Sequence, residues 1–384
     1  MKPAPETQAA RPGSSRPARR TLVGGLAASA AALGGAWPAR AEGSGSGVSA
    51  GASPGAFPLA PQQAPRGGGA DVLAVVQKSG HALAFHDTAS GRLLARVPLE
   101  RYPHEMVADS RRRYAYIGHY GVRMSGDLGR GGWGVWVVDL RARRLVRTLG
   151  TGPFRRVHGM ATDRHDRVYA RAETDAVLLG YDEPRTATAP SRVVPTGGAK
   201  THLCAVDRDG ERAYVTGLDS HTVSLVRPHD PVALPVTASP GPRPEGCCLG
   251  PDGRILYVGV RGSGMVVAMD ADTLAVTGNY DTGGGDPLRI YAAGPAATEL
   301  LLVTDITQRT VTLLDTTLRR VATIPLAGVP SAVSLHPHAP LAYVSELDTG
   351  QVTVLDLEQR CVIGGFAVGG EPDSSILLPA PVRS

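Results

Sequence analysis

A repeating unit occupies the sequence after residue 70. Each unit contains an alternating run that ends in Tyr-Val or a similar pair, a polar turn, a second apolar run that ends in Asp, and a third run. The first run recurs at Tyr116-Ile117, Tyr169-Ala170, Tyr214-Val215, Tyr257-Val258, Leu302-Val303 and Tyr343-Val344. The unit is about 42–54 residues long, which is typical of a four-stranded propeller blade. The repeat therefore predicts an all-β fold in which each unit forms one blade.

The blades can be counted from the starts of their first strands. Seven starts recur, at Pro103-His104-Glu105, Val157-His158-Gly159, Thr201-His202-Leu203, Pro244-Glu245-Gly246, Leu288-Arg289-Ile290, Pro330-Ser331-Ala332 and Pro372-Asp373-Ser374. The seventh start is followed by one strand, Ser375 to Leu378, and three strand-like runs precede the first start: Val72–Gln77, Ala82–Asp87 and Arg92–Pro98. One C-terminal strand and three N-terminal strands would complete the seventh blade and hide the exposed sheet edges. We expect a seven-bladed β-propeller over residues 71–384.

The N-terminal residues have the features of an export signal. Arg19-Arg20 precedes an uncharged Ala/Gly/Leu stretch that runs to Trp37, and Ala39-Arg40-Ala41 has the small-x-small form of a cleavage site. This pattern resembles a twin-arginine signal peptide over residues 1–41, and a disordered basic tail beside a chance apolar run is the alternative. Residues 42–70 are rich in Gly, Ser and Pro and predict a flexible linker. We expect a periplasmic or extracellular product with no membrane span in the mature chain.

The positive charge of the chain is confined to this leader. The formal net charge is +5, and residues 1–41 hold six basic residues and one acidic residue, so the rest of the chain is neutral. Binding to nucleic acid or to an anionic membrane depends on basic charge. A neutral body therefore argues against nucleic-acid partners.

Two segments carry a family resemblance. The runs Pro251-Asp252-Gly253-Arg254-Ile255-Leu256-Tyr257-Val258 and Ala213-Tyr214-Val215-Thr216 resemble the YVTN family of seven-bladed propellers. This family includes YncE-like periplasmic proteins, surface-layer repeats and relatives of the haem d1 propeller. The resemblance implies the fold over residues 71–380 but no single function, because this scaffold hosts binding modules, enzymes and interaction proteins. The fourth motif position, commonly Asn in the family, is occupied here by His119, Ala172, Gly217, Val260, Asp305 and Glu346.

The repeat alignment brings chemically active residues to one position. His104, His158 and His202 are equivalent in three consecutive blades, followed by Glu245 in blade four, Arg289 and Ser331 in blades five and six, and Asp373 in blade seven. The first strand of each blade lines the central channel, so these side chains should converge at its mouth. Three imidazoles beside a carboxylate suit Zn, Fe or Cu. A metal-free polar ligand pocket and solvated histidines are the alternatives.

Blade one contains the longest insertion, Tyr120 to Gly134. The insertion joins the second and third strands, so it should overhang the same face as the histidines. Long loops on rigid scaffolds often bind ligands. We therefore predict ligand contacts from His119, Tyr120 and Arg123, together with Arg289 and Asp373 of the ring; a solvated surface loop is the alternative.

The four cysteines leave two alternatives open. Cys204 could meet Cys248 across the gap between blades three and four if the strand pleat has the required hand, and export permits a disulfide. The alternative is buried free thiols, because Cys packs well as a small apolar group.

Three functions fit these features. The first is an exported propeller that binds a small ligand, a metal or a protein partner at the channel mouth. The second is a metal-dependent hydrolase or oxidoreductase, in which His104, His158 and His202 hold one Fe, Cu or Zn ion and Glu105 or Glu245 is a ligand or general base. The third is a haem-type cofactor carrier with one axial histidine. The sequence does not decide whether the protein is an enzyme.

Overall fold

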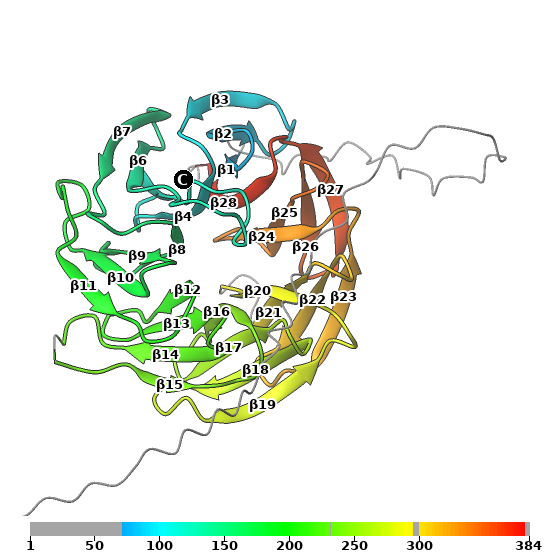
Figure 1. The fold of residues 1–384 in the computed structure, drawn as a ribbon. Helices are drawn as coiled ribbons and strands as arrows, with labels where there is room; N and C mark the ends of the chain where they lie inside the picture. Colours follow the sequence, from blue (N-terminus) through cyan, green and yellow to red (C-terminus); the bar gives the residue numbers. More distant parts are fainter. Residues whose placement is uncertain (1–70, 231, 295–298, 381–384) are drawn as a thin grey trace, which may run out of the picture. The chain divides into compact units, whose positions relative to one another are not determined.

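The chain forms seven four-stranded antiparallel sheets arranged in a ring (Figure 1). The computed structural model describes residues 71–380 apart from 231 and 295–298. Within these residues every regular element is a strand, which confirms the all-β class and the seven blades predicted from the repeat. No helix in the described residues could cross a membrane. The predicted signal peptide and linker, residues 1–70, lie outside the described residues.

Blades one to three each contain four strands in chain order from the channel outward. Blade one consists of β4 (Pro103–Ala108), β5 (Tyr114–His119), β6 (Val135–Asp139) and β7 (Arg144–Leu149). Blade two consists of β8 (Val157–Thr162), β9 (Val168–Ala172), β10 (Val177–Tyr181) and β11 (Arg192–Pro195). Blade three consists of β12 (Thr201–Val206), β13 (Ala213–Gly217), β14 (Thr222–Val226) and β15 (Val236–Ala238).

Blades four to six repeat this order. Blade four consists of β16 (Pro244–Leu249), β17 (Ile255–Val260), β18 (Met265–Asp270) and β19 (Val276–Asp281). Blade five consists of β20 (Pro287–Ala292), β21 (Leu300–Asp305), β22 (Thr310–Asp315) and β23 (Arg320–Pro325). Blade six consists of β24 (Pro330–Leu335), β25 (Leu341–Glu346), β26 (Gln351–Asp356) and β27 (Cys361–Ala367).

Blade seven joins the two ends of the propeller, as predicted. Its strand order is β28 (Pro372–Leu378), β1 (Val72–Gln77), β2 (Ala82–Asp87) and β3 (Leu93–Pro98). β28 pairs with β1 in antiparallel register, with Val72 opposite Leu378. The ring therefore closes through hydrogen bonds between segments about three hundred residues apart, and Figure 1 shows red and blue strands side by side in this blade.

Apolar side chains fill the space between neighbouring blades. Leu83 and Phe85 of blade seven, for example, pack in one buried cluster with Ile117 and Trp136 of blade one. The inner strands also approach closely: a Cβ atom on Gly159 would lie 2.8 Å from the carbonyl oxygen of His202, so glycine is required there. This packing fixes the inner strands as a rigid frame for the channel side chains.

The inner strands share an irregular start that affects the channel. In blade one the register against β5 shifts between Pro103 and Met106, and the corresponding shift occurs in blades two, three and four. Such a shift breaks the strict alternation of side chains. His104 and Glu105 are consequently turned toward each other, with 3.6 Å between Nδ1 and Oε1.

Candidate functional site

The predicted ring position forms a buried cluster at one end of the channel. His104, His158, His202, Glu245, Ser331 and Asp373 are all buried. The imidazole ring of His158 lies between the other two, with centroid distances of 4.0 Å to His104 and 3.7 Å to His202. The structure thus brings the three predicted histidines together.

Blade five departs from the predicted register. β20 begins at Pro287, so Leu288 takes the ring position and Arg289 follows it, as Glu105 follows His104. Arg289 and Glu105 meet from opposite sides of the channel, with 2.5 Å between Nη2 and Oε1. The guanidinium of Arg289 overcomes the effect of burial and lowers the pKa of Glu105.

His104 lies at the centre of a charged group. Its Nδ1 is 3.0 Å from Asp373 Oδ2, and its Nε2 is 3.0 Å from Lys78 Nζ. Both ring nitrogens of His104 thus have a polar neighbour, Lys78 on one side and Asp373 on the other. Burial would raise the pKa of Asp373, but His104, Lys78 and Arg289 together lower it. Asp373 is therefore ionised in this cluster.

His158 has a different environment. Its side chain is 2% exposed, and its Nδ1 has no hydrogen-bond partner among the described residues. Tyr120 covers it edge-on, with 4.8 Å between ring centroids. Burial, followed by the positive charge of its neighbours, lowers the pKa of His158 well below its usual value. His158 is thus a neutral imidazole with an unused ring nitrogen.

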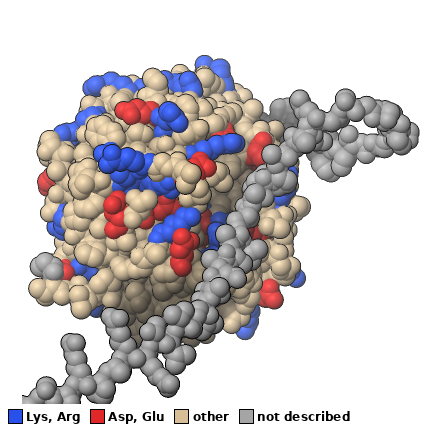
Figure 2. Space-filling model, viewed as in Figure 1, with Lys and Arg blue, Asp and Glu red and all other residues tan. Residues whose placement is uncertain are grey.

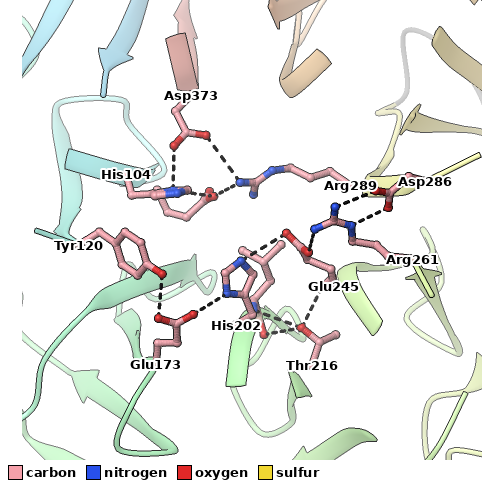
Figure 3. Close-up of polar contacts among 12 residues, drawn as sticks. His104, Tyr120, Glu173, His202, Thr216, Glu245, Arg261, Asp286, Arg289 and Asp373 are labelled. Atoms are coloured by element: carbon pink, nitrogen blue, oxygen red, sulfur yellow. Dashed lines mark hydrogen bonds and ion pairs between the residues drawn. The ribbon is translucent and has the colours of Figure 1, made fainter. Parts of the chain in front are cut away.

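His202 is held by two carboxylates. Its Nδ1 is 3.1 Å from Glu173 Oε1 and its Nε2 is 3.3 Å from Glu245 Oε1 (Figure 3). Burial would lower the pKa of His202, but Glu245 and Glu173 raise it. Both ring nitrogens are occupied, so His202 is an imidazolium that neutralises buried carboxylates.

A second tier of residues completes the site. Each member directly follows the second strand of its blade: Lys78 after β1, Tyr120 after β5, Glu173 after β9 and Arg261 after β17. Tyr120 donates to Glu173 at 2.8 Å, and Arg261 donates to Glu245 at 2.6 Å. Sequence reasoning identified only Tyr120 of these four. The repeat phase could have found the other three. The same position is apolar in the remaining blades, where it holds Leu218, Ile306 and Leu347, so Lys78, Glu173 and Arg261 stand out as polar exceptions.

The insertion after β5 covers the blade-one side of the channel mouth (Figure 1). Arg123 reaches across to blade seven, where its Nε donates to Glu371 Oε1 at 3.0 Å. Arg156 donates to the backbone oxygen of Gly129 at 2.9 Å. Tyr120, at the root of the insertion, is fully buried over His104 and His158. The insertion therefore closes this end of the channel, as its position predicted.

His119 and Arg123 lie on the outer side of the insertion. They line a groove of about 790 Å³ with Tyr102 and Trp133, and His119 stacks on Trp136 with 4.5 Å between centroids. The three ring histidines do not line this groove. Figure 2 shows acidic and basic side chains interspersed on the visible face. The predicted ligand residues thus fall into two places: His119 and Arg123 at the groove, and Tyr120, Arg289 and Asp373 at the buried cluster.

The described part of the chain brings one group of three metal-ligand side chains together. One ligand atom each from His104, Glu105 and His158 lies within 4.8 Å of the others. Four buried atoms here, His104 Nδ1, Glu105 Oε1, His158 Nδ1 and Asp373 Oδ2, lack a well-directed hydrogen bond within the described part of the chain. His202 does not belong to this group, so the grouping differs from the predicted set of three histidines.

Of the two alternatives for the cysteines, the structure has the free thiols and not the Cys204–Cys248 disulfide. All four cysteines are free thiols in the described chain. Cys204 packs with the cluster between blades two and three, whereas Cys248 packs with the cluster between blades four and five. The alternation of side chains along the strands therefore points the Cys204 and Cys248 thiols away from each other. The residue of blade four that faces blade three is Cys247.

Comparisons with known proteins support the architecture. No family model matches the chain, and no curated protein matches it in sequence. The periplasmic gluconolactonase PpgL of Pseudomonas aeruginosa is similar in structure, with a TM-score of 0.66, 16% identity, and coverage of 81% of this chain and 99% of that one. A protein from Bacteroides fragilis described as a 6-phosphogluconolactonase matches with a TM-score of 0.65, 13% identity, and coverage of 81% and 98%.

A functionally unknown protein from Desulfotomaculum acetoxidans gives a TM-score of 0.66 at 10% identity, covering 81% of this chain and 100% of its own. At such identities the likeness concerns the fold alone. The YVTN resemblance, the export signal and the haem-type carrier stay predictions. What is established is a seven-bladed β-propeller whose structural neighbours include gluconolactonase-like propellers.

Proposed function

We propose that this protein is an exported propeller that binds one transition-metal ion at His104, Glu105 and His158. The observation that carries the proposal is the convergence of three ligand-type side chains around His158 Nδ1, which has no hydrogen-bond partner among the described residues. A metal bound to His104 would replace its contact with Lys78 or Asp373. A buried polar atom without a partner costs about 1–3 kcal/mol, and a bound metal would remove that cost for His158 Nδ1. The export part rests on the Arg19-Arg20 leader alone.

The charges around this group restrict which metal would fit. The carboxylates of Glu105 and Asp373 favour a cation, whereas Lys78 and Arg289 oppose it. Carboxylates therefore supply little net attraction, and binding would depend on the imidazole nitrogens. Nitrogen donors suit Zn²⁺ and Cu²⁺ better than Mg²⁺ or Ca²⁺. His158 is the most available donor of the set because its lowered pKa keeps the ring unprotonated at neutral pH.

Under this proposal, His202 and Glu245 have other roles than the metal ligand and the general base that the sequence suggested. His202 would support the site without binding the metal, because Glu173 and Glu245 occupy both its nitrogens. Burial would raise the pKa of Glu245, but His202 and Arg261 lower it, so Glu245 stays ionised and is a weak base. Glu105 remains as the carboxylate that could serve the metal.

The test is metal content and affinity of the protein purified without a histidine tag. Titration of the metal-free protein with Zn²⁺ or Cu²⁺ should show one site per chain. His158→Ala should weaken binding at least about a hundredfold, since one of three protein ligands is lost. His338→Ala, a substitution in an exposed turn, is the matched control and should leave binding unchanged.

His202→Gln separates this proposal from a three-histidine site. It should keep metal affinity within a few-fold of wild type, provided circular dichroism shows a folded chain. A protein that takes up no Zn²⁺ or Cu²⁺, or an affinity unaffected by His158→Ala, would contradict the proposal.

A further inference from the structure

The channel below the histidines contains a second cavity, which shares only Glu105 with the proposed metal site. Its volume is about 330 Å³. Glu105 and Arg289 lie at one end, and the walls are mostly apolar and sulfur-containing: Met160, Leu203, Cys204, Cys247, Cys248, Ile290 and Tyr291. We propose that this cavity binds a small, uncharged aromatic alcohol, a function that goes beyond metal binding.

The polar end of the cavity carries unmet hydrogen-bonding capacity. Arg289 is only 7% exposed, and its Nε has no hydrogen-bond partner in the described ranges of the chain. Glu105 Oε1 lies 2.5 Å from Arg289 Nη2, and the carboxylate can accept further hydrogen bonds. A hydroxyl group can accept from the Nε–H and donate to the carboxylate at the same time. One hydroxyl would therefore satisfy the Arg289 Nε–H and add a donor to the Glu105 carboxylate.

Charge balance decides against an anionic or cationic ligand. Glu105 and Asp373 are matched by Arg289 and Lys78 within a few ångströms. A further charge would enter a buried environment without a counter-ion, which is costly. The ligand that fits this end is therefore neutral.

The walls favour an aromatic body. Cys204, Cys247 and Cys248 line the cavity from the inner strands β12 and β16, although each also packs between neighbouring blades. Burial raises the pKa of Cys204 and of Cys248 to about 12, so these thiols are uncharged. Sulfur atoms make favourable contacts with aromatic rings. An apolar cavity of about 150 Å³ accepts benzene, so about 330 Å³ admits two fused rings.

The cavity opens away from the insertion after β5. Its far end is lined by Leu249, Ala292 and Leu335, which are the last residues of β16, β20 and β24. The opposite end is covered by the buried Tyr120 ring. The ligand would enter from the face opposite the insertion, whereas the sequence placed the binding site at the insertion.

Three probes of one size test the proposed chemistry. 2-Naphthol carries the hydroxyl, naphthalene lacks it, and 2-naphthoate carries a charge in its place. Calorimetry or ligand fluorescence should show one 2-naphthol site per chain, with affinity at least tenfold higher than for either comparator. Equal affinity for the three probes, or no saturable 2-naphthol binding, would overturn the inference.

Variants test the location. Leu203 faces the cavity and belongs to no blade-to-blade cluster, so Leu203→Trp should fill the space and lower 2-naphthol affinity at least twentyfold, while Leu203→Ala should retain binding. Leu335→Trp, at the far end of the cavity, should also block 2-naphthol binding. It replaces Leu203→Trp in the test if that variant does not fold. Trp133→Ala, in the outer groove, should have no effect. If both filling variants fold and bind 2-naphthol as wild type does, the site is elsewhere.

The metal and the aromatic alcohol can be separated experimentally. His158→Ala should lose Zn²⁺ or Cu²⁺ and keep 2-naphthol, whereas Leu203→Trp should show the reverse. Failure of the metal proposal therefore leaves the cavity proposal testable, and the converse also holds.

Discussion

The substitution His202→Gln tests the assignment of His202 as a buried imidazolium. In the wild type its two nitrogens lie 3.1 and 3.3 Å from the carboxylates of Glu173 and Glu245. Removing one partner of a buried ion pair costs about 3–5 kcal/mol. Glu173 keeps Tyr120 and Glu245 keeps Arg261, so we expect the lower end, about 3 kcal/mol. At about 2 °C per kcal/mol for a large domain, the Tm should fall by about 6 °C.

The loss of Tm caused by His202→Gln should depend on pH, and the direction follows from the pKa of His202. The folded-state pKa of His202 is raised, so its stabilising contribution is complete below the unfolded-state pKa and is lost as pH rises through the folded-state value. The Tm difference between wild type and His202→Gln should therefore be largest in mildly acidic solution and shrink in alkaline solution.

Thermal unfolding followed by circular dichroism at several pH values is the assay, and the double-mutant cycle with Glu245→Gln isolates the pair. The two single substitutions should not add, because each removes the same contact. A Tm change below about 2 °C at every pH, with additive single effects, would refute the buried ion pair.

Three further outcomes are expected. Lys78→Met should tighten Zn²⁺ binding at least tenfold, because Lys78 Nζ lies 3.0 Å from His104 Nε2 and its removal relieves at least about 1.4 kcal/mol of repulsion; a weaker site would show that Lys78 supports binding instead. Arg123→Gln should change the Tm by less than about 2 °C, because its ion pair with Glu371 is part-exposed and worth at most about 1 kcal/mol; a larger loss would mean that the insertion holds the ring together. His158→Leu should make the protein less sensitive to acid between pH 6 and pH 4, because a histidine with a lowered pKa resists protonation only while folded; unfolding curves that shift equally with pH in both proteins would contradict this.

Much of the architecture follows from the repeat alone. The number of blades, the closure through β28 and β1, and the shared position of His104, His158 and His202 are all visible as a period in the chain. Each blade repeats the same strand and turn chemistry, so local patterns suffice to place it. The only misplaced start was in blade five, where Arg289 lies one residue beyond the ring position.

The roles of the site residues did not follow from that period. Lys78, Glu173 and Arg261 follow the second strands of three different blades and contact ring residues of the same or the adjacent blade. The period gives their positions, but the packing of the blades decides these contacts. Whether Cys204 and Cys248 can pair depended on which side of the sheet each side chain points to, and the order of residues does not reveal this.

The sequence alone thus specified where each side chain stands within its own blade, because strand periodicity is a property of a few neighbouring residues. Closure of the ring decided which side chains become partners, which imidazole is charged and which stays neutral. Those properties depend on burial and on charges brought within a few ångströms by strands distant in the chain.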